Sequence, residues 1–68
     1  MLSRYDIFCK VVELGSFTRA AEALGYSQSA VSQTVKALEE ELGTALVSRG
    51  KGGVMLTADG ESYLSYLR

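Results

Sequence analysis

The side chains with the most suggestive chemistry in this sequence lie between positions 28 and 36. If this stretch forms a helix with 3.6 residues per turn, five polar side chains share one side of it. They are Gln28, Ser29, Ser32, Gln33 and Lys36. Glutamine pairs with adenine through two hydrogen bonds, serine can donate to or accept from any base, and lysine reaches a guanine edge or a phosphate. We therefore predict that this face reads base-pair edges in the major groove of double-stranded DNA.

The distribution of charge supports this prediction, although the chain as a whole is slightly acidic. Seven Lys and Arg residues against eight Asp and Glu residues give a formal net charge of −1. Residues 23–38 and 43–58 contain no acidic residue, whereas positions 39–41 are all glutamate. The distance from Gln28 to Glu40 is about 18 Å at 1.5 Å per helical residue. A locally cationic face can therefore bind phosphate on an acidic chain.

Three helices are predicted from apolar residues spaced three and four apart and from a glycine at the end of each. They span about residues 3–14, a short stretch before Gly25, and residues 28–42. Ser16 or Thr18 would cap the second helix and Ser27 the third, after a very short turn. The expected inward-facing residues are Tyr5, Phe8, Cys9 and Val12 in the first helix, Ala20, Ala21 and Leu24 in the second, and Val31, Val35, Leu38 and Leu42 in the third.

A glycine-rich hairpin and a further helix are predicted after the third helix. Residues 45–48 and 54–56 have the pattern of short strands, and the loop 49–53 between them carries Arg49 and Lys51 without any negative charge. We interpret this hairpin as a wing that touches the DNA backbone or minor groove. Thr57 would cap the last helix, whose apolar pattern is still running at Arg68, so we expect the natural protein to continue.

Composition excludes several other kinds of site. The chain has no His, and its single Cys lies on an apolar stripe, so we predict no metal, no cofactor and no enzymatic activity. The longest apolar run is far short of the ~20 residues that span a membrane, and the N-terminus lacks the apolar stretch of a signal peptide. We therefore expect a cytoplasmic protein that has no membrane partner.

Several segments resemble the DNA-binding domain of LysR-type transcriptional regulators, in order and over essentially the whole chain. Residues 15–24 resemble the start of that family's helix-turn-helix, and residues 27–33 resemble the start of its recognition helix. Residues 38–43, followed by Leu46, Arg49, Leu56, Thr57 and Gly60, resemble the family's wing and the start of its linker helix. Many members have proline where this chain has Ser29 and phenylalanine where it has Val47.

The resemblance implies a mainly α, winged helix-turn-helix fold with a three-helix core, a short β-hairpin wing and the start of a C-terminal linker helix. The domain would cover residues 1–57, and residues 58–68 would begin the linker and dimerisation helix. The full-length bacterial protein would be a homodimer or tetramer on DNA. Its small-molecule effector would bind a domain that is absent here.

The predicted DNA contacts combine the chemistry of the residues with the resemblance. The recognition helix, about residues 28–42, would enter the major groove, and the wing, about 46–56, would lie on the backbone or minor groove. Arg19 would be a phosphate clamp or a surface residue, and Thr18 a cap or a phosphate contact. The predicted contact residues are Thr18, Arg19, Ser27, Gln28, Ser29, Ser32, Gln33, Lys36, Arg49 and Lys51.

Two alternatives fit the same sequence. One is the winged-helix domain of another regulator family, such as a molybdate-responsive regulator. The other is a helical protein-interaction or dimerisation module that associates through the last helix, with a face made of Tyr63, Leu64, Tyr66 and Leu67. DNA binding would weaken steeply with added salt, whereas association through an apolar face would not.

Overall fold

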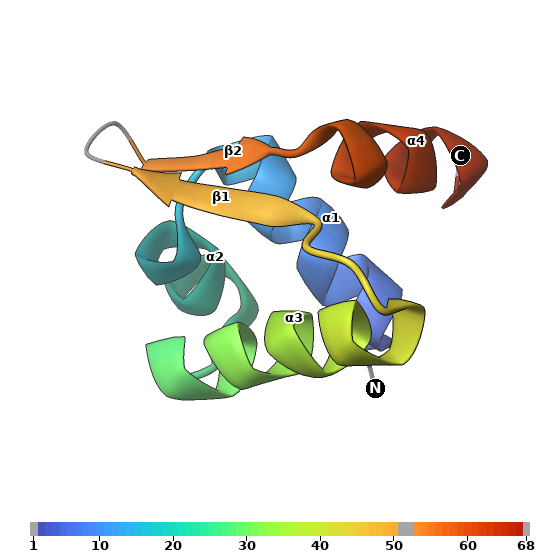
Figure 1. The fold of residues 1–68 in the computed structure, drawn as a ribbon. Helices are drawn as coiled ribbons and strands as arrows, with labels where there is room; N and C mark the ends of the chain where they lie inside the picture. The colour runs from blue at the N-terminus through green and yellow to red at the C-terminus, as the bar shows by residue number, and fades with distance from the viewer. Residues whose placement is uncertain (1, 51–52, 68) are drawn as a thin grey trace.

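The computed structural model describes residues 2–50 and 53–67. The elements in chain order are α1 (Arg4–Leu14), α2 (Phe17–Leu24), α3 (Gln28–Leu42), β1 (Val47–Gly50), β2 (Gly53–Leu56) and α4 (Ala58–Leu67). Figure 1 shows α3 along one side of the molecule, with the β1–β2 hairpin and α4 along the other and α1 and α2 between them. This arrangement confirms the predicted mainly α fold with a single hairpin in the described part of the chain. None of the helices described is both long and apolar enough to cross a membrane.

Serine side chains begin the first three helices, as local sequence signals predict. The hydroxyl of Ser16 accepts a hydrogen bond from the amide of Arg19, so Ser16 and not Thr18 caps α2. Ser27 caps α3 by accepting from the amide of Ala30 at 3.1 Å. Gly25 ends α2 at a φ of 74°, in the left-handed region that favours glycine. The connection between α2 and α3 is therefore only three residues long.

The core lies where α1, α2 and α3 meet beneath the hairpin. The fully buried side chains of greatest volume are Phe8, Leu38, Leu46, Val11, Val31 and Val35. Two residues predicted to face inward are in fact exposed: Leu42 is 41% exposed and Tyr5 is 39% exposed. Leu42 is the last residue of α3, and Tyr5 lies in the first turn of α1, where the centre of its ring is 6.3 Å from the centre of the Tyr63 ring. Both residues thus lie at helix ends.

The strands differ from the predicted ones at their boundaries. β1 begins two residues later than expected and includes Arg49, and β2 begins one residue earlier, at Gly53. The antiparallel register pairs Val47 with Leu56 and Gly50 with Gly53. Ala45 lies outside β1, and its carbonyl accepts a hydrogen bond from the Thr57 hydroxyl at 2.6 Å. The residues just before the strand are thus bonded to the start of α4.

Two anchors hold the hairpin against the helices. On one side, the Val54 amide donates to the Gly15 carbonyl at 3.0 Å, and a Cβ at Gly53 would lie 2.6 Å from that same oxygen. On the other side, Oε2 of Glu39 accepts from the amides of Leu46 at 2.7 Å and Val47 at 3.1 Å. The hairpin is thus fastened both to the α1–α2 connection and to α3.

The last helix begins as predicted, because the Thr57 hydroxyl accepts from the Gly60 amide at 2.9 Å. Gly60 packs so closely on the hairpin that a Cβ there would lie 2.0 Å from the Leu46 carbonyl oxygen. The association face suggested for α4 is divided. Leu64 belongs to the core, and the ring of Tyr63 packs on that of Phe8 with 5.9 Å between the ring centres. Tyr66, in contrast, is 84% exposed.

Candidate DNA-binding interface

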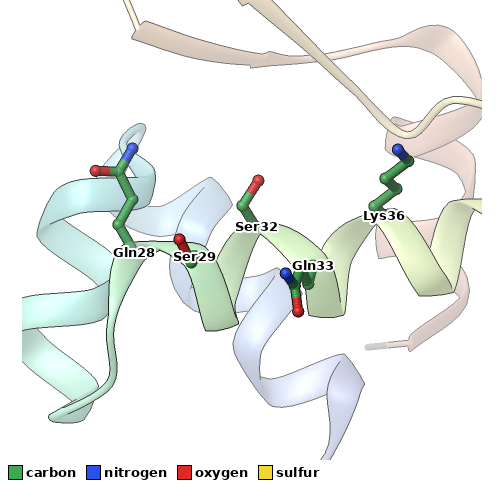
Figure 2. A pocket seen from close by; sticks show the side chains of 5 residues that line it. All are labelled: Gln28, Ser29, Ser32, Gln33 and Lys36. Carbon is green, nitrogen blue, oxygen red and sulfur yellow. The ribbon is translucent and has the colours of Figure 1, made fainter.

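Five residues of α3 line an open depression of about 500 Å³ on the outside of the domain (Figure 2). They are Gln28, Ser29, Ser32, Gln33 and Lys36, which we call the recognition surface. Ser32 is half-buried and the other four are exposed. The polar side of α3 therefore faces outward, as its spacing predicts. The surface contains amides, hydroxyls and one ammonium group, and it contains no carboxylate.

The recognition surface consists of two rows of side chains. Gln28, Ser32 and Lys36 are spaced four apart and rise from the same edge of α3, as Figure 2 shows. Ser29 and Gln33 form the second row, one residue further along each turn. The hairpin lies beside the first row, because Ser32 contacts a residue of β1. The second row is the part of the surface that is furthest from the hairpin.

Arg49 lies elsewhere than predicted, in β1 and not in the loop. Its Nη2 donates a hydrogen bond to the Ser32 hydroxyl at 2.6 Å. The guanidinium carbon is also 4.3 Å from the centre of the Phe17 ring, in a cation–π contact. Arg49 therefore brings a second cation to the edge of the recognition surface. The sequence contains no local signal for this contact, since it joins residues that are 17 and 32 positions apart.

The remaining predicted contact residues lie close to this surface or outside the described residues. Thr18 and Arg19 are exposed in the first turn of α2, directly after the ring that Arg49 covers. Ser27 immediately precedes the recognition surface and serves as the α3 cap. Lys51 lies outside the described residues. A contact of any of these residues with DNA stays a prediction.

The three consecutive glutamates at the end of α3 have different surroundings. The Glu39 carboxylate faces the base of the hairpin, where it accepts from two backbone amides. Glu41 forms an ion pair with Arg4 of α1 at 3.0 Å. Glu40 is exposed and follows Lys36 by four residues, so it continues the first row of the recognition surface. Only one of the three acids is thus aligned with the candidate DNA-binding side chains.

The described residues hold no group of three or more His, Cys, Asp or Glu side chains that could bind a metal ion. The functional groups that the described residues bring together are instead the hydrogen-bonding side chains on α3 and two nearby cations, Lys36 and Arg49. Such a set can recognise the edges of bases and the phosphates that flank them.

Comparisons with known proteins agree with this interpretation. Residues 2–61 match the model of the family described as bacterial regulatory helix-turn-helix protein, lysR family. An HTH-type transcriptional repressor of Pseudomonas aeruginosa is 52% identical over 62 residues, which are 91% of this chain and 20% of that protein. The HTH-type transcriptional activator AaeR of Escherichia coli is 48% identical over the same shares. The chain thus spans about a fifth of the length of these curated relatives.

Solved structures of DNA complexes have the same fold. The BenM DNA-binding domain bound to the catB site 1 DNA has a TM-score of 0.88 at 40% identity, covering 93% of this chain and 71% of that one. The CbnR DNA-binding domain bound to DNA has a TM-score of 0.88 at 35% identity, covering 93% and 72%. These comparisons confirm the predicted winged helix-turn-helix fold. With the family model matched over residues 2–61, they place this chain in the LysR family of bacterial regulatory helix-turn-helix proteins.

Proposed function

We propose that this domain binds double-stranded DNA sequence-specifically, with the N-terminal half of α3 in the major groove. The observation that carries the proposal is the recognition surface, which is outward-facing, rich in amides and hydroxyls, and free of carboxylates. The groups on Gln28, Ser29 and Gln33 match the donors and acceptors of base edges. DNA complexes of the similar BenM and CbnR domains support the same role here.

The placement of the hairpin supports its role as a wing. In Figure 1 the end of the hairpin at which β1 ends and β2 begins lies at the same end of the molecule as the N-terminal end of α3, and α4 extends toward the opposite end. A duplex that received α3 would therefore meet the hairpin, about residues 46–56, beside it. In this hairpin we assign a phosphate or minor-groove contact to Lys51, and outside it we assign phosphate contacts to Thr18, Arg19 and Ser27.

We infer that residues 1–57 form the DNA-binding unit and that residues 58–68 begin a linker helix through which the full-length protein forms a homodimer or tetramer. The exposure of Tyr66 on α4 supports an additional contact there. The length of the relatives supports a further domain, to which we assign the binding of a small-molecule effector. A regulator that acts on chromosomal DNA would work in the bacterial cytoplasm. Since the relatives include a repressor and an activator, the shared domain does not determine the direction of regulation.

Selection of bound duplexes from a random pool tests the proposal. The wild-type chain should enrich one motif, and its affinity should fall with salt with a log–log slope of about −4 to −5, as expected for about four to six phosphate contacts. Gln33→Ala should change the preferred base at one position. Arg19→Ala should weaken all sequences about equally and reduce the salt slope by about 1.

Lys10 provides a matched control for the loss of a cation. It lies on α1, outside the recognition surface, and its ammonium pairs with Glu13 at 3.3 Å. Lys10→Ala should therefore leave both the motif and the salt slope unchanged. The absence of any enriched motif for the wild-type chain would contradict the proposed function.

A further inference from the structure

We propose that Arg49 determines specificity indirectly, by biasing the Ser32 hydroxyl to act as a hydrogen-bond donor toward the major groove. This inference rests on the proposed DNA binding and assigns a base preference to one position of the recognition surface. Arg49 is therefore interpreted as a positioning residue, and Ser32 as the residue that touches the base. The expected preference is for a base that presents an acceptor.

The guanidinium of Arg49 is held from several sides. Its backbone is paired with Val54 in the hairpin, and the Val54 amide is in turn bonded to Gly15. Its planar head lies over the ring of Phe17, which is itself only 6% exposed. A side chain that is already ordered in the free protein loses little conformational entropy when DNA binds. Arg49 can thus hold its partner in one orientation before DNA arrives.

The hydrogen bond from Arg49 and the charge of its guanidinium together favour one orientation of the Ser32 hydroxyl. A serine hydroxyl has one proton to donate and two lone pairs to accept with, whereas a guanidinium can only donate. Nη2 of Arg49 therefore occupies one of the two lone pairs of Ser32 Oγ, at a distance of 2.6 Å. The positive charge beside the second lone pair repels a further donor and attracts an acceptor, so the hydroxyl is biased to donate. Among the residues that the structure describes, none accepts the Ser32 proton. Thr34 provides the contrast, because its hydroxyl donates to the Ala30 carbonyl on its own helix at 2.8 Å.

A Ser32 hydroxyl that is biased to donate discriminates among bases. In the major groove guanine offers N7 and O6, adenine offers N7, and thymine offers O4 as acceptors, whereas cytosine offers only the N4 amino donor. Cytosine should therefore be disfavoured at the base that Ser32 faces. Without Arg49 the hydroxyl could accept as readily as donate, and cytosine would be tolerated.

Binding-site selection with Ser32→Ala and Arg49→Lys tests this inference on the whole chain. Ser32→Ala removes the donor, so it should relax the discrimination against cytosine at one position by about fivefold, which corresponds to one hydrogen bond. Arg49→Lys keeps the charge but lacks the planar guanidinium, which stacks on the Phe17 ring and donates to the Ser32 hydroxyl at the same time. It should relax discrimination at the same position, with an unchanged salt slope. The double variant should be no more relaxed than Ser32→Ala alone.

A simple phosphate contact by Arg49 predicts a different set of results. Arg49→Lys would then keep the cytosine discrimination, and Arg49→Ala would weaken all sequences equally and reduce the salt slope by about 1. Either that result, or relaxation at a different position from Ser32→Ala, would overturn the inference. Circular dichroism shows whether Arg49→Ala still folds; if it does not, Arg49→Lys and Ser32→Ala decide the question. A wild-type chain that enriches no motif would instead contradict the proposed function itself.

Discussion

Replacing Glu39 with alanine should weaken the domain more than replacing any other glutamate of α3, because Glu39 joins the helix to the hairpin. One oxygen of its carboxylate accepts from the amides of Leu46 at 2.7 Å and Val47 at 3.1 Å. Alanine leaves both amides without this acceptor. Glutamine keeps a carbonyl oxygen in the same place and removes only the charge.

The size of the effect follows from these two bonds. A hydrogen bond to a charged group contributes about 1.5–3 kcal/mol, and the lower value suits this partly buried site. Glu39→Ala should therefore lower the free energy of unfolding by about 3 kcal/mol. Neutral bonds are about half as strong, so Glu39→Gln should cost about 1.5 kcal/mol. Because a domain of this size has a stability of about 3–5 kcal/mol, the alanine variant should be close to unfolding.

Thermal unfolding followed by circular dichroism measures the difference. At about 4–8 °C per kcal/mol, Tm should fall by about 12–24 °C for Glu39→Ala and about half as much for Glu39→Gln. Glu40→Ala is the matched control: Glu40 is exposed, and its side chain has no ionic or hydrogen-bonding partner within the described ranges, so the change should stay within about 0.5 kcal/mol. A Glu39→Ala variant as stable as Glu40→Ala would refute the reasoning.

Three other changes have clear expected outcomes. Gly60→Ala would place a Cβ 2.0 Å from the Leu46 carbonyl oxygen, so the urea midpoint of this variant should fall well below that of the wild type. Ser62→Ala, at an exposed position on α4, is the control and should unfold at a higher midpoint. Equal midpoints for the two variants would contradict the close packing. Glu40→Gln should raise DNA affinity more at 0.01 M salt, where the Debye length is about 30 Å, than at 0.15 M, where it is about 8 Å. Glu40 is about 6 Å along the helix from Lys36 and about 18 Å from Gln28, so at the higher salt its charge acts only on the near end of the recognition surface. Fluorescence anisotropy showing the same gain at both concentrations would argue against this geometry. Burial raises the pKa of Tyr63 above its ordinary value of 10.0, so the neutral ring stabilises the fold below that pH and this contribution is lost as pH rises through the higher folded-state pKa. Tyr63→Phe should therefore lose less stability between pH 9 and pH 11 than the wild type in urea titrations, and an identical loss would show that Tyr63 does not contribute.

Much of the fold could be predicted from the sequence because its signals are local. Ser27 at the start of α3 and the glycine after its end set the helix bounds within one chain segment. The same 3.6-residue period separates Val31 and Val35, which are buried, from Gln28 and Gln33, which are exposed. The polar face that forms the candidate site was therefore predictable before any tertiary contact was known.

Other features depend on residues that are distant in sequence. Leu42 continues the apolar stripe of α3 and is nevertheless 41% exposed, and Ala45, predicted to lie in a strand, is bonded through its carbonyl to Thr57. The sequence shows Arg49 only as a cation near glycines, and its strand position and its contact with Ser32 appear once the hairpin is folded against α3. Helix caps and hydrophobic periodicity depend on residues that are close together in the chain, so the sequence alone determines the helices and their polar face. The pairing of a cation with one hydroxyl needs a separation of a few ångströms between distant segments, and only tertiary packing decides that.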